Sequence, residues 1–368
     1  MRDTAAGGLA CLLARPAWRD GDPGPALRDA ITRLVTDGSP LVRMRAVGAC
    51  HVLYAELGPA ERVAALRGYV MAESDKRVLA VLLSELSRDA VSAPEEVDAV
   101  LRQFSNRPAG AFLTAQTGAV VQESLLPLLA YLAAVPQTPF AAGLVGGWFR
   151  NAVVHHEQVC RLLHGLRQFL NNPDGLGQQA VFALLESAAV SARDHWQDMQ
   201  GEQADGTAPD ADALAAAAEV AHGIAERVYF ASGAFDERSG GTKEPAARGD
   251  SHRFADLAVP ILRVCAEVPV PQCVQAAVQT LVHLAPLSER RMLLAVAAAV
   301  PERSAYAADS LAGGVVLPYL QRLLAVRPAL VLHDPDGLAA FRHLLQTFAA
   351  AGNEEALTLA YSFADVFR

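Results

Sequence analysis

The sequence predicts an all-α fold of stacked antiparallel helical hairpins, with about sixteen to eighteen helices joined by short turns. Apolar residues recur at helical spacing through most of the 368 residues, as at Val97, Val100, Leu101 and Phe104. Period-two runs of β-branched residues, which would indicate strands, are nearly absent. Helix-starting turns separate the apolar stripes. Together these observations favour many short helices over any sheet.

Proline and glycine mark where the predicted helices begin and bend. Proline in the first turn of a helix costs no hydrogen bond, so turns that contain it indicate helix starts. Such turns are Gly58-Pro59, Ala93-Pro94, Asn172-Pro173-Asp174-Gly175 and Asp334-Pro335-Asp336-Gly337. Three more prolines lie inside apolar helical patterns, where each kinks its helix or occupies its first turn: Pro127, Pro260 and Pro318.

Some predicted helices are apolar on nearly every side. Val78 to Leu83 reads VLAVLL, and Met292 to Val300 reads MLLAVAAAV. A helix of this kind must be covered on more than one face. Stacked hairpins provide such cover, because each hairpin lies between two neighbours.

Composition excludes several classes of protein. The chain is 52% hydrophobic and only 19% charged, which excludes a wholly disordered protein. The formal net charge is −9, and this acidic balance argues against a general nucleic-acid binder. The pairs Arg43/Arg45 and Arg290/Arg291 could contact phosphate or an acidic partner, but no aromatic residues are interleaved with them. We therefore expect no nucleic-acid partner.

The cysteines indicate a reducing compartment. Five widely spaced cysteines do not form a disulfide framework, and no CxxC pair supports a zinc knuckle. We interpret all of them as small buried thiols of a cytoplasmic protein: Cys11, Cys50, Cys160, Cys265 and Cys273. The apolar stretch Leu9 to Ala14 is too short for a signal peptide.

Two polar segments divide the helical pattern. Residues 201–209 and 236–252 are rich in glycine, proline and charge, and they are expected to be loops. The sequence thus predicts an N-terminal array at 1–200, a loop-helix-loop insertion at 201–252 with its helix at about 210–232, and a C-terminal array at 253–368. One continuous solenoid with two insertions fits the same pattern.

One segment is long enough to cross a membrane. Ser124 to Phe149 has no charged residue over 26 positions. Pro136-Gln137-Thr138-Pro139 cuts it into halves of the length of buried core helices. The favoured interpretation is two core helices and no membrane contact, and a peripheral membrane subunit is an alternative.

Two segments align as hairpins. Leu27–Leu57 and Leu257–Leu284 each contain an apolar helix, a tight turn and a second helix, with Val42-Arg43 opposite Val274-Gln275. The first turn, Asp37-Gly-Ser-Pro-Leu-Val-Arg-x-x-Ala, resembles that of HEAT repeats. The resemblance implies a right-handed α-α superhelix, a HEAT/ARM-like solenoid. It also implies that Asp37 and Arg43 belong to a structural ladder along the stack, although the second hairpin has Pro269 and Gln275 instead.

The last sixty residues, from Tyr306 onward, are similar to the helical C-terminal region of large bacterial STAND/NACHT-type ATP-binding proteins, several of which act in antiphage defence. This resemblance implies a bacterial sensor or recognition module that binds a protein partner, such as an ATPase or effector component. The chain departs from that family in lacking GxxxxGK[ST], since neither Lys76 nor Lys243 follows such a loop.

One helical segment resembles a metal-binding motif. His156-Glu157-Gln158-Val159-Cys160 has the form H-E-x-x-C, and His156, Cys160 and His164 are spaced at i, i+4 and i+8. Each step of four residues turns by about 40°, so the three side chains drift around the helix. The favoured interpretation is a polar helix flank with a packed thiol. The alternative is a metal-dependent hydrolase that uses His156, Glu157, Cys160 and His164.

No other motif indicates catalysis. The chain has no G-x-S-x-G elbow and no predicted strand to carry one. Acidic pairs lie at predicted helix starts, where free N–H groups favour them: Glu95-Glu96, Glu354-Glu355 and Asp210/Asp212. We therefore expect a non-catalytic protein-protein interaction scaffold, with no cofactor, no metal and no small-molecule substrate.

Overall fold

The protein is all-helical, as the sequence predicts. The computed structural model describes residues 2–19, 24–106, 119–172, 175–204, 210–235, 249–302 and 305–362. These residues contain 20 α-helices and no strand. The prediction of sixteen to eighteen helices is lower because three helices of four or five residues carry too little periodicity to be recognised: α2 (Pro16–Arg19), α5 (Cys50–Leu53) and α19 (Pro328–Leu332).

Two compact units make up the chain, Met1–Val145 and Gly146–Arg368. The division falls inside α10 (Pro139–Arg150), earlier than the expected boundaries at 200 and 252. The helix expected at about 210–232 is α13 (Ala211–Ser232), and it packs against four helices of the second unit. Most of the two expected loops, 205–209 and 236–248, lies outside the described residues.

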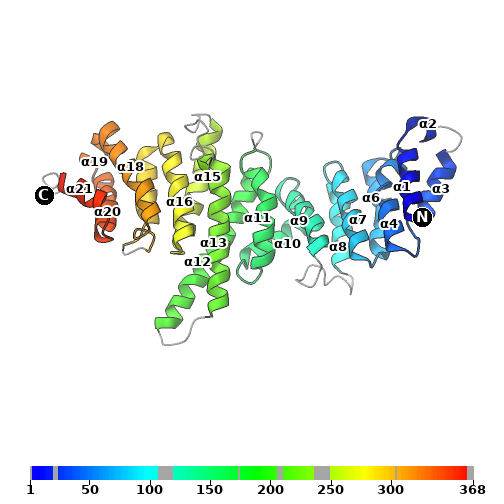
Figure 1. The fold of residues 1–368 in the computed structure, drawn as a ribbon, viewed down its shortest axis with the longest axis horizontal. Helices are drawn as coiled ribbons and strands as arrows, with labels where there is room; N and C mark the ends of the chain where they lie inside the picture. The colour runs from blue at the N-terminus through cyan, green and yellow to red at the C-terminus, as the bar shows by residue number, and fades with distance from the viewer. Residues whose placement is uncertain are drawn as a thin grey trace. The chain divides into compact units, whose positions relative to one another are not determined.

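The first unit is built around α7 (Lys76–Asp89). This helix packs against α4 (Pro40–Val47), α6 (Pro59–Ala72), α8 (Pro94–Ser105) and α9 (Ala119–Ala134). Two of the other helices, α1 (Arg2–Leu13) and α3 (Gly24–Leu34), pack against α4 and against each other. Figure 1 shows these helices following one another in chain order. These neighbours bury most of the apolar residues of α7 from Val78 to Leu86, while Ser84, Ser87 and Arg88 of the same helix stay exposed.

The second unit has a matching centre. There α13 packs against α11 (His156–Leu170), α12 (Gln178–Ala204), α15 (Gly249–Ala266) and α16 (Pro271–Leu284) (Figure 1). The apolar α17 (Glu289–Ala299) packs against α15, α16 and α20 (Pro335–Ala350), so it too is covered on more than one side. Shorter neighbours complete the unit: η2 (Ala285–Leu287), α18 (Ser310–Val326), α19 and α21 (Glu354–Ser362).

Local residues set the helix ends much as expected. Pro59, Pro94 and Pro335 each begin a helix, while Pro173 lies outside the described residues. The internal prolines are inside α9, α15 and α18. Glu95-Glu96 and Glu354-Glu355 occupy first turns, and Asp210 caps α13 by accepting from two backbone N–H groups.

The cysteines follow the prediction except at the first helix. Cys50, Cys265 and Cys273 are buried, and Cys160 is half-buried. Cys11 is exposed, so the prediction of a buried thiol there is wrong. Its helix, α1, stands at the end of the first unit, where its contacts with α2, α3, α4 and α5 leave Cys11 exposed.

No single helix among the described residues is long and apolar enough to cross a membrane. The uncharged segment forms two helices, which end and begin on either side of the predicted break at Pro136–Pro139. Together Val121–Ala134 and Pro139–Arg150 meet the length and composition of a span, but they are bent by 102°.

A candidate binding site in the first compact unit

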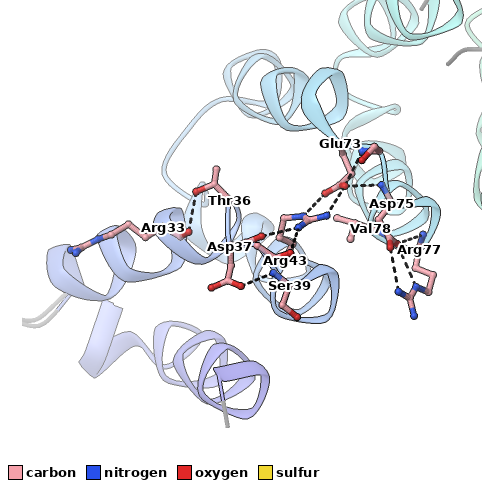
Figure 2. A network of polar contacts seen from close by, with 11 residues as sticks. Arg33, Thr36, Asp37, Ser39, Arg43, Glu73, Asp75, Arg77 and Val78 are labelled. Carbon is pink, nitrogen blue, oxygen red and sulfur yellow. Dashed lines mark hydrogen bonds and ion pairs between the residues drawn. The ribbon is translucent and has the colours of Figure 1, made fainter. Parts of the chain in front are cut away.

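The two ladder residues predicted from the repeat lie close together, Asp37 in the turn before α4 and Arg43 near the start of α4. Arg43 Nη1 donates to the carbonyl oxygens of Asp37 and Gly38, at 2.7 and 3.2 Å. The carboxylate of Asp37 accepts from the backbone N–H of Ser39 at 2.8 Å. Figure 2 shows both side chains closing the turn that precedes α4. The structure therefore brings Asp37 and Arg43 together, with the contact made through the Asp37 carbonyl.

The carboxylate partner of Arg43 is Glu73, which the sequence analysis missed. Arg43 Nε and Nη2 donate to the two Glu73 oxygens at 2.7 and 2.9 Å (Figure 2). Glu73 Oε1 also accepts from the backbone N–H groups of Ser74 and Asp75. This geometry joins the turn before α4 to the turn before α7. No local signal predicts a pairing across 30 residues.

Burial and hydrogen bonding oppose each other at Glu73. Burial alone would raise the pKa of this carboxyl, which is 8% exposed. The hydrogen bonds from Arg43, Asp75 and Ser74 outweigh burial, and the pKa is lowered. Glu73 is therefore an ionised, fully engaged carboxylate with a structural role.

A second arginine, two helices later in the chain, makes the same kind of connection. Arg62, near the start of α6, donates from Nη1 to the carbonyl of Leu57 in the preceding turn, at 2.8 Å. Its Nε donates to Oδ1 of Asp89, at the end of α7, at a distance of 3.0 Å. Each arginine thus holds the turn before its own helix and a carboxylate from a later part of the chain.

A hollow of about 290 Å³ lies beside this second contact. We call it the Glu85 hollow, and it is lined by Cys50, His51, Tyr54, Ala55, Arg62, Leu66, Glu85, Arg88 and Asp89. Its residues come from α5, α6 and α7 and from the turn after α5. Seven of its nine lining residues are titratable, which is more than in either of the other two hollows described for this unit. We therefore take it as the candidate site.

Glu85 is the unusual member of this hollow. The residue is only 5% exposed, and its Oε2 makes no hydrogen bond to any described residue. His51 Nδ1 lies 3.5 Å from Oε2, and Arg88 Nη2 lies 3.6 Å from Oε1. Burial raises the pKa of Glu85, Arg88 opposes the rise, and the negative charge of Asp89 adds to it.

The Cys50 thiol in this hollow is not in the thiolate form that nucleophilic catalysis requires. Burial raises the pKa of the Cys50 thiol to about 12, so at neutral pH it stays protonated. The thiol points to the carbonyl of Ala46, 3.9 Å away. Burial and the nearby Arg88 lower the pKa of His51. A protonated thiol beside an uncharged imidazole is suited to packing and hydrogen bonding. Glu85, in contrast, is suited to accept a hydrogen bond from a donor that enters the hollow.

Two more hollows flank the site in the same unit. One, of about 340 Å³, includes Arg43, Tyr69 and Glu73. The hydroxyl of Tyr69 is 3.1 Å from that of Tyr54, which lines the Glu85 hollow. The other, the α7–α9 groove, has about 320 Å³ and includes Ser84, Ser87, Val91 and residues of α9.

The metal-motif residues lie on α11 in the second unit. His156 and Cys160 are half-buried, whereas Glu157 and His164 are exposed. Within the described ranges, no group of three or more His, Cys, Asp and Glu side chains could hold a metal ion. Burial also raises the pKa of the Cys160 thiol to about 11, which disfavours the thiolate that a metal needs. The drift of about 40° per step separates the three side chains.

The arginine pair Arg290/Arg291 is engaged inside the second unit. Arg290 contacts the carboxylates of Asp334 and Asp336 at the start of α20, and Arg291 contacts Asp256 of α15. The neighbouring Glu289 contacts Arg327 at 2.6 Å. The first turn of α17 therefore connects three other segments. Arg290 and Arg291, which the sequence offers as possible contacts to phosphate or to an acidic partner, are thus paired with carboxylates of the chain itself.

Family models gave no match to the chain, and comparisons with curated proteins and with solved structures found no significant similarity. The function is therefore argued from the residues and their geometry.

Proposed function

We propose that this protein is a non-catalytic scaffold that recognises a protein partner, built as a HEAT-like, right-handed stack of helical hairpins. The observation that carries the proposal is the packing order of the helices. In each unit a central helix packs against its neighbours in the chain and against helices that lie beyond them, as α7 packs against α6 and α8 and also against α4 and α9. Stacked hairpins pack in this way, and their extended surfaces serve binding.

The arginine contacts support the same architecture. Arg43 and Arg62 each tie a preceding turn to a carboxylate about 30 residues later in the chain, at Glu73 and Asp89. Contacts of this kind, which tie one turn to a later part of the chain, are expected where successive hairpins stack. The expected partner is a protein, such as an ATPase or effector component of a bacterial defence system.

The proposal is tested by site-specific photo-crosslinking in cells of the organism that encodes the protein. A photoreactive phenylalanine analogue replaces Val91, which lines the α7–α9 groove and is 70% exposed. The control carries the analogue at Val154 in the second unit, which is also 70% exposed. We expect one adduct of defined mass at Val91. The absence of an adduct, or the same mixture of adducts at both positions, would contradict a scaffold that binds through this region.

A further inference from the structure

The Glu85 carboxylate lacks the hydrogen bonds that its burial requires. Buried carboxylates are ordinarily paired or hydrogen-bonded, because desolvation of an unpaired charge is costly. Glu73, 12 positions earlier, meets this requirement through Arg43 and two backbone N–H groups. Glu85 Oε2 is buried with no hydrogen bond, and it lines an open hollow. The hollow therefore presents an acceptor without a donor.

The arginines around Glu85 are either bonded to other groups or exposed to solvent. Arg62, from α6, is held by Asp89 and by the Leu57 carbonyl. Arg88 has a side chain that is 55% exposed and makes only a 3.6 Å contact with Oε1. His51, from α5, has a lowered pKa, so its ring near Oε2 is uncharged at neutral pH. Among the residues that the structure describes, no positive charge is held against Oε2.

The size of the hollow limits what can enter. About 290 Å³ is at the lower end of the range for small-molecule sites and suits the end of one side chain. The walls supply apolar contacts from Leu66 and Ala55 and a ring from Tyr54. An aliphatic stem with a cationic head fits such walls, since the stem packs on apolar surface while the head reaches the carboxylate.

We propose that the Glu85 hollow binds a lysine or arginine side chain of the protein partner, whose cationic head donates to Glu85 Oε2. This inference rests on the proposed scaffold function and names the chemistry that the partner presents. An anionic guest is less suited, because it would approach a buried carboxylate whose own donor is missing. The donor brings both a positive charge and the missing hydrogen bond, and such charge-assisted bonds are the stronger kind.

The first experiment titrates the full chain with capped arginine, Nα-acetyl-arginine N-methylamide, and with the neutral citrulline analogue of the same shape. The protein is labelled with fluorotyrosine, and Tyr54→Phe identifies the Tyr54 signal in the fluorine NMR spectrum. We expect a saturable shift of that signal with arginine at millimolar concentration and none with citrulline. Equal shifts with both probes, or no saturable shift with arginine, would overturn the proposal.

Two glutamine variants separate the site from net charge. Glu85→Gln removes the acceptor charge, and Glu56→Gln makes the same change at a glutamate whose side chain is 69% exposed and pairs with Arg28. We expect Glu85→Gln to weaken arginine binding by about tenfold or more and Glu56→Gln to leave it unchanged. Wild-type affinity in Glu85→Gln would contradict the proposal. Circular dichroism confirms that both variants are folded.

The Val91 crosslink distinguishes this inference from the scaffold proposal. If the adduct forms and its yield falls with Glu85→Gln but not with Glu56→Gln, the partner uses the hollow. If the adduct forms equally in both variants, the scaffold stands and the hollow is not the recognition site. If arginine binds to the hollow but no adduct forms at Val91, the scaffold proposal fails at that surface.

Discussion

Glu73 and Glu85 are two buried glutamates of the first unit with opposite surroundings. They are 8% and 5% exposed, so burial is nearly the same. Arginine and two backbone N–H groups lower the pKa of Glu73, whereas desolvation raises the pKa of Glu85. The difference comes from the backbone. Glu73 lies in the turn between α6 and α7, where the backbone N–H groups of Ser74 and Asp75 are available because α7 has not yet begun, while Glu85 lies inside α7, where the helix uses its own N–H groups.

The largest effect is expected from Glu73→Ala. Removing this carboxylate leaves Arg43 half-buried without its partner and two turn N–H groups without an acceptor. Breaking a buried pair in this way costs about 3 kcal/mol of unfolding free energy. Urea titration with hydrogen exchange of the α4, α6 and α7 amides measures the loss locally. A loss close to that of an exposed ion pair would show that the Arg43–Glu73 contact does not stabilise the unit.

Glu85→Gln is expected to act in the opposite direction. At pH 8 the variant removes a buried charge that has no hydrogen bond at Oε2, so the unfolding free energy rises by about 1 kcal/mol. The same local hydrogen-exchange measurement applies, with Glu56→Gln as the exposed control. A destabilisation like that of Glu73→Ala would mean that Glu85 has donors of its own and would remove the contrast between the two residues.

The pH dependence of the two variants should also have opposite signs. The pKa of Glu73 is lowered from 4.5, so its contribution to stability is present above that value and is lost as the pH falls below it. The pKa of Glu85 is raised from 4.5, so the folded unit binds the extra proton, and stability falls as the pH rises above that value. The difference in unfolding free energy between wild type and Glu73→Ala should therefore rise with pH, and that between wild type and Glu85→Gln should fall with pH, in urea titrations between about pH 3 and pH 8.

The smallest effect is expected from Arg290→Gln in the second unit. The Arg290 side chain is 51% exposed, and its partners Asp334 and Asp336 lie at a helix start with backbone contacts of their own. Exposed ion pairs contribute little to the unfolding free energy, because water screens them. Urea denaturation in low and high salt measures this change, which salt should erase. A loss comparable to that of Glu73→Ala would mean that exposure does not decide the strength of these contacts.

Local signals predicted much of the fold because they act within a few residues. Pro59 and Pro94 begin helices where the sequence places them, and the break at Pro136–Pro139 separates α9 from α10. The broken second helix of the first hairpin was not predicted. There α4 ends at Val47 and α5 begins at Cys50, within a single apolar pattern. The two units divide inside α10, where no change in the composition of the sequence marks a boundary.

The sequence by itself determined the helices, their starts and the all-α class, because proline, capping aspartates and apolar periodicity act on the backbone next to them. The resemblance to a HEAT repeat placed Asp37 in the turn before a helix and Arg43 near the start of that helix, where they lie. Only the tertiary structure decided that Arg43 meets Glu73 and that Glu85 is buried without a donor, because α5, α6 and α7 must first pack together. Such contacts join residues about 30 positions apart, over which local patterns carry no information.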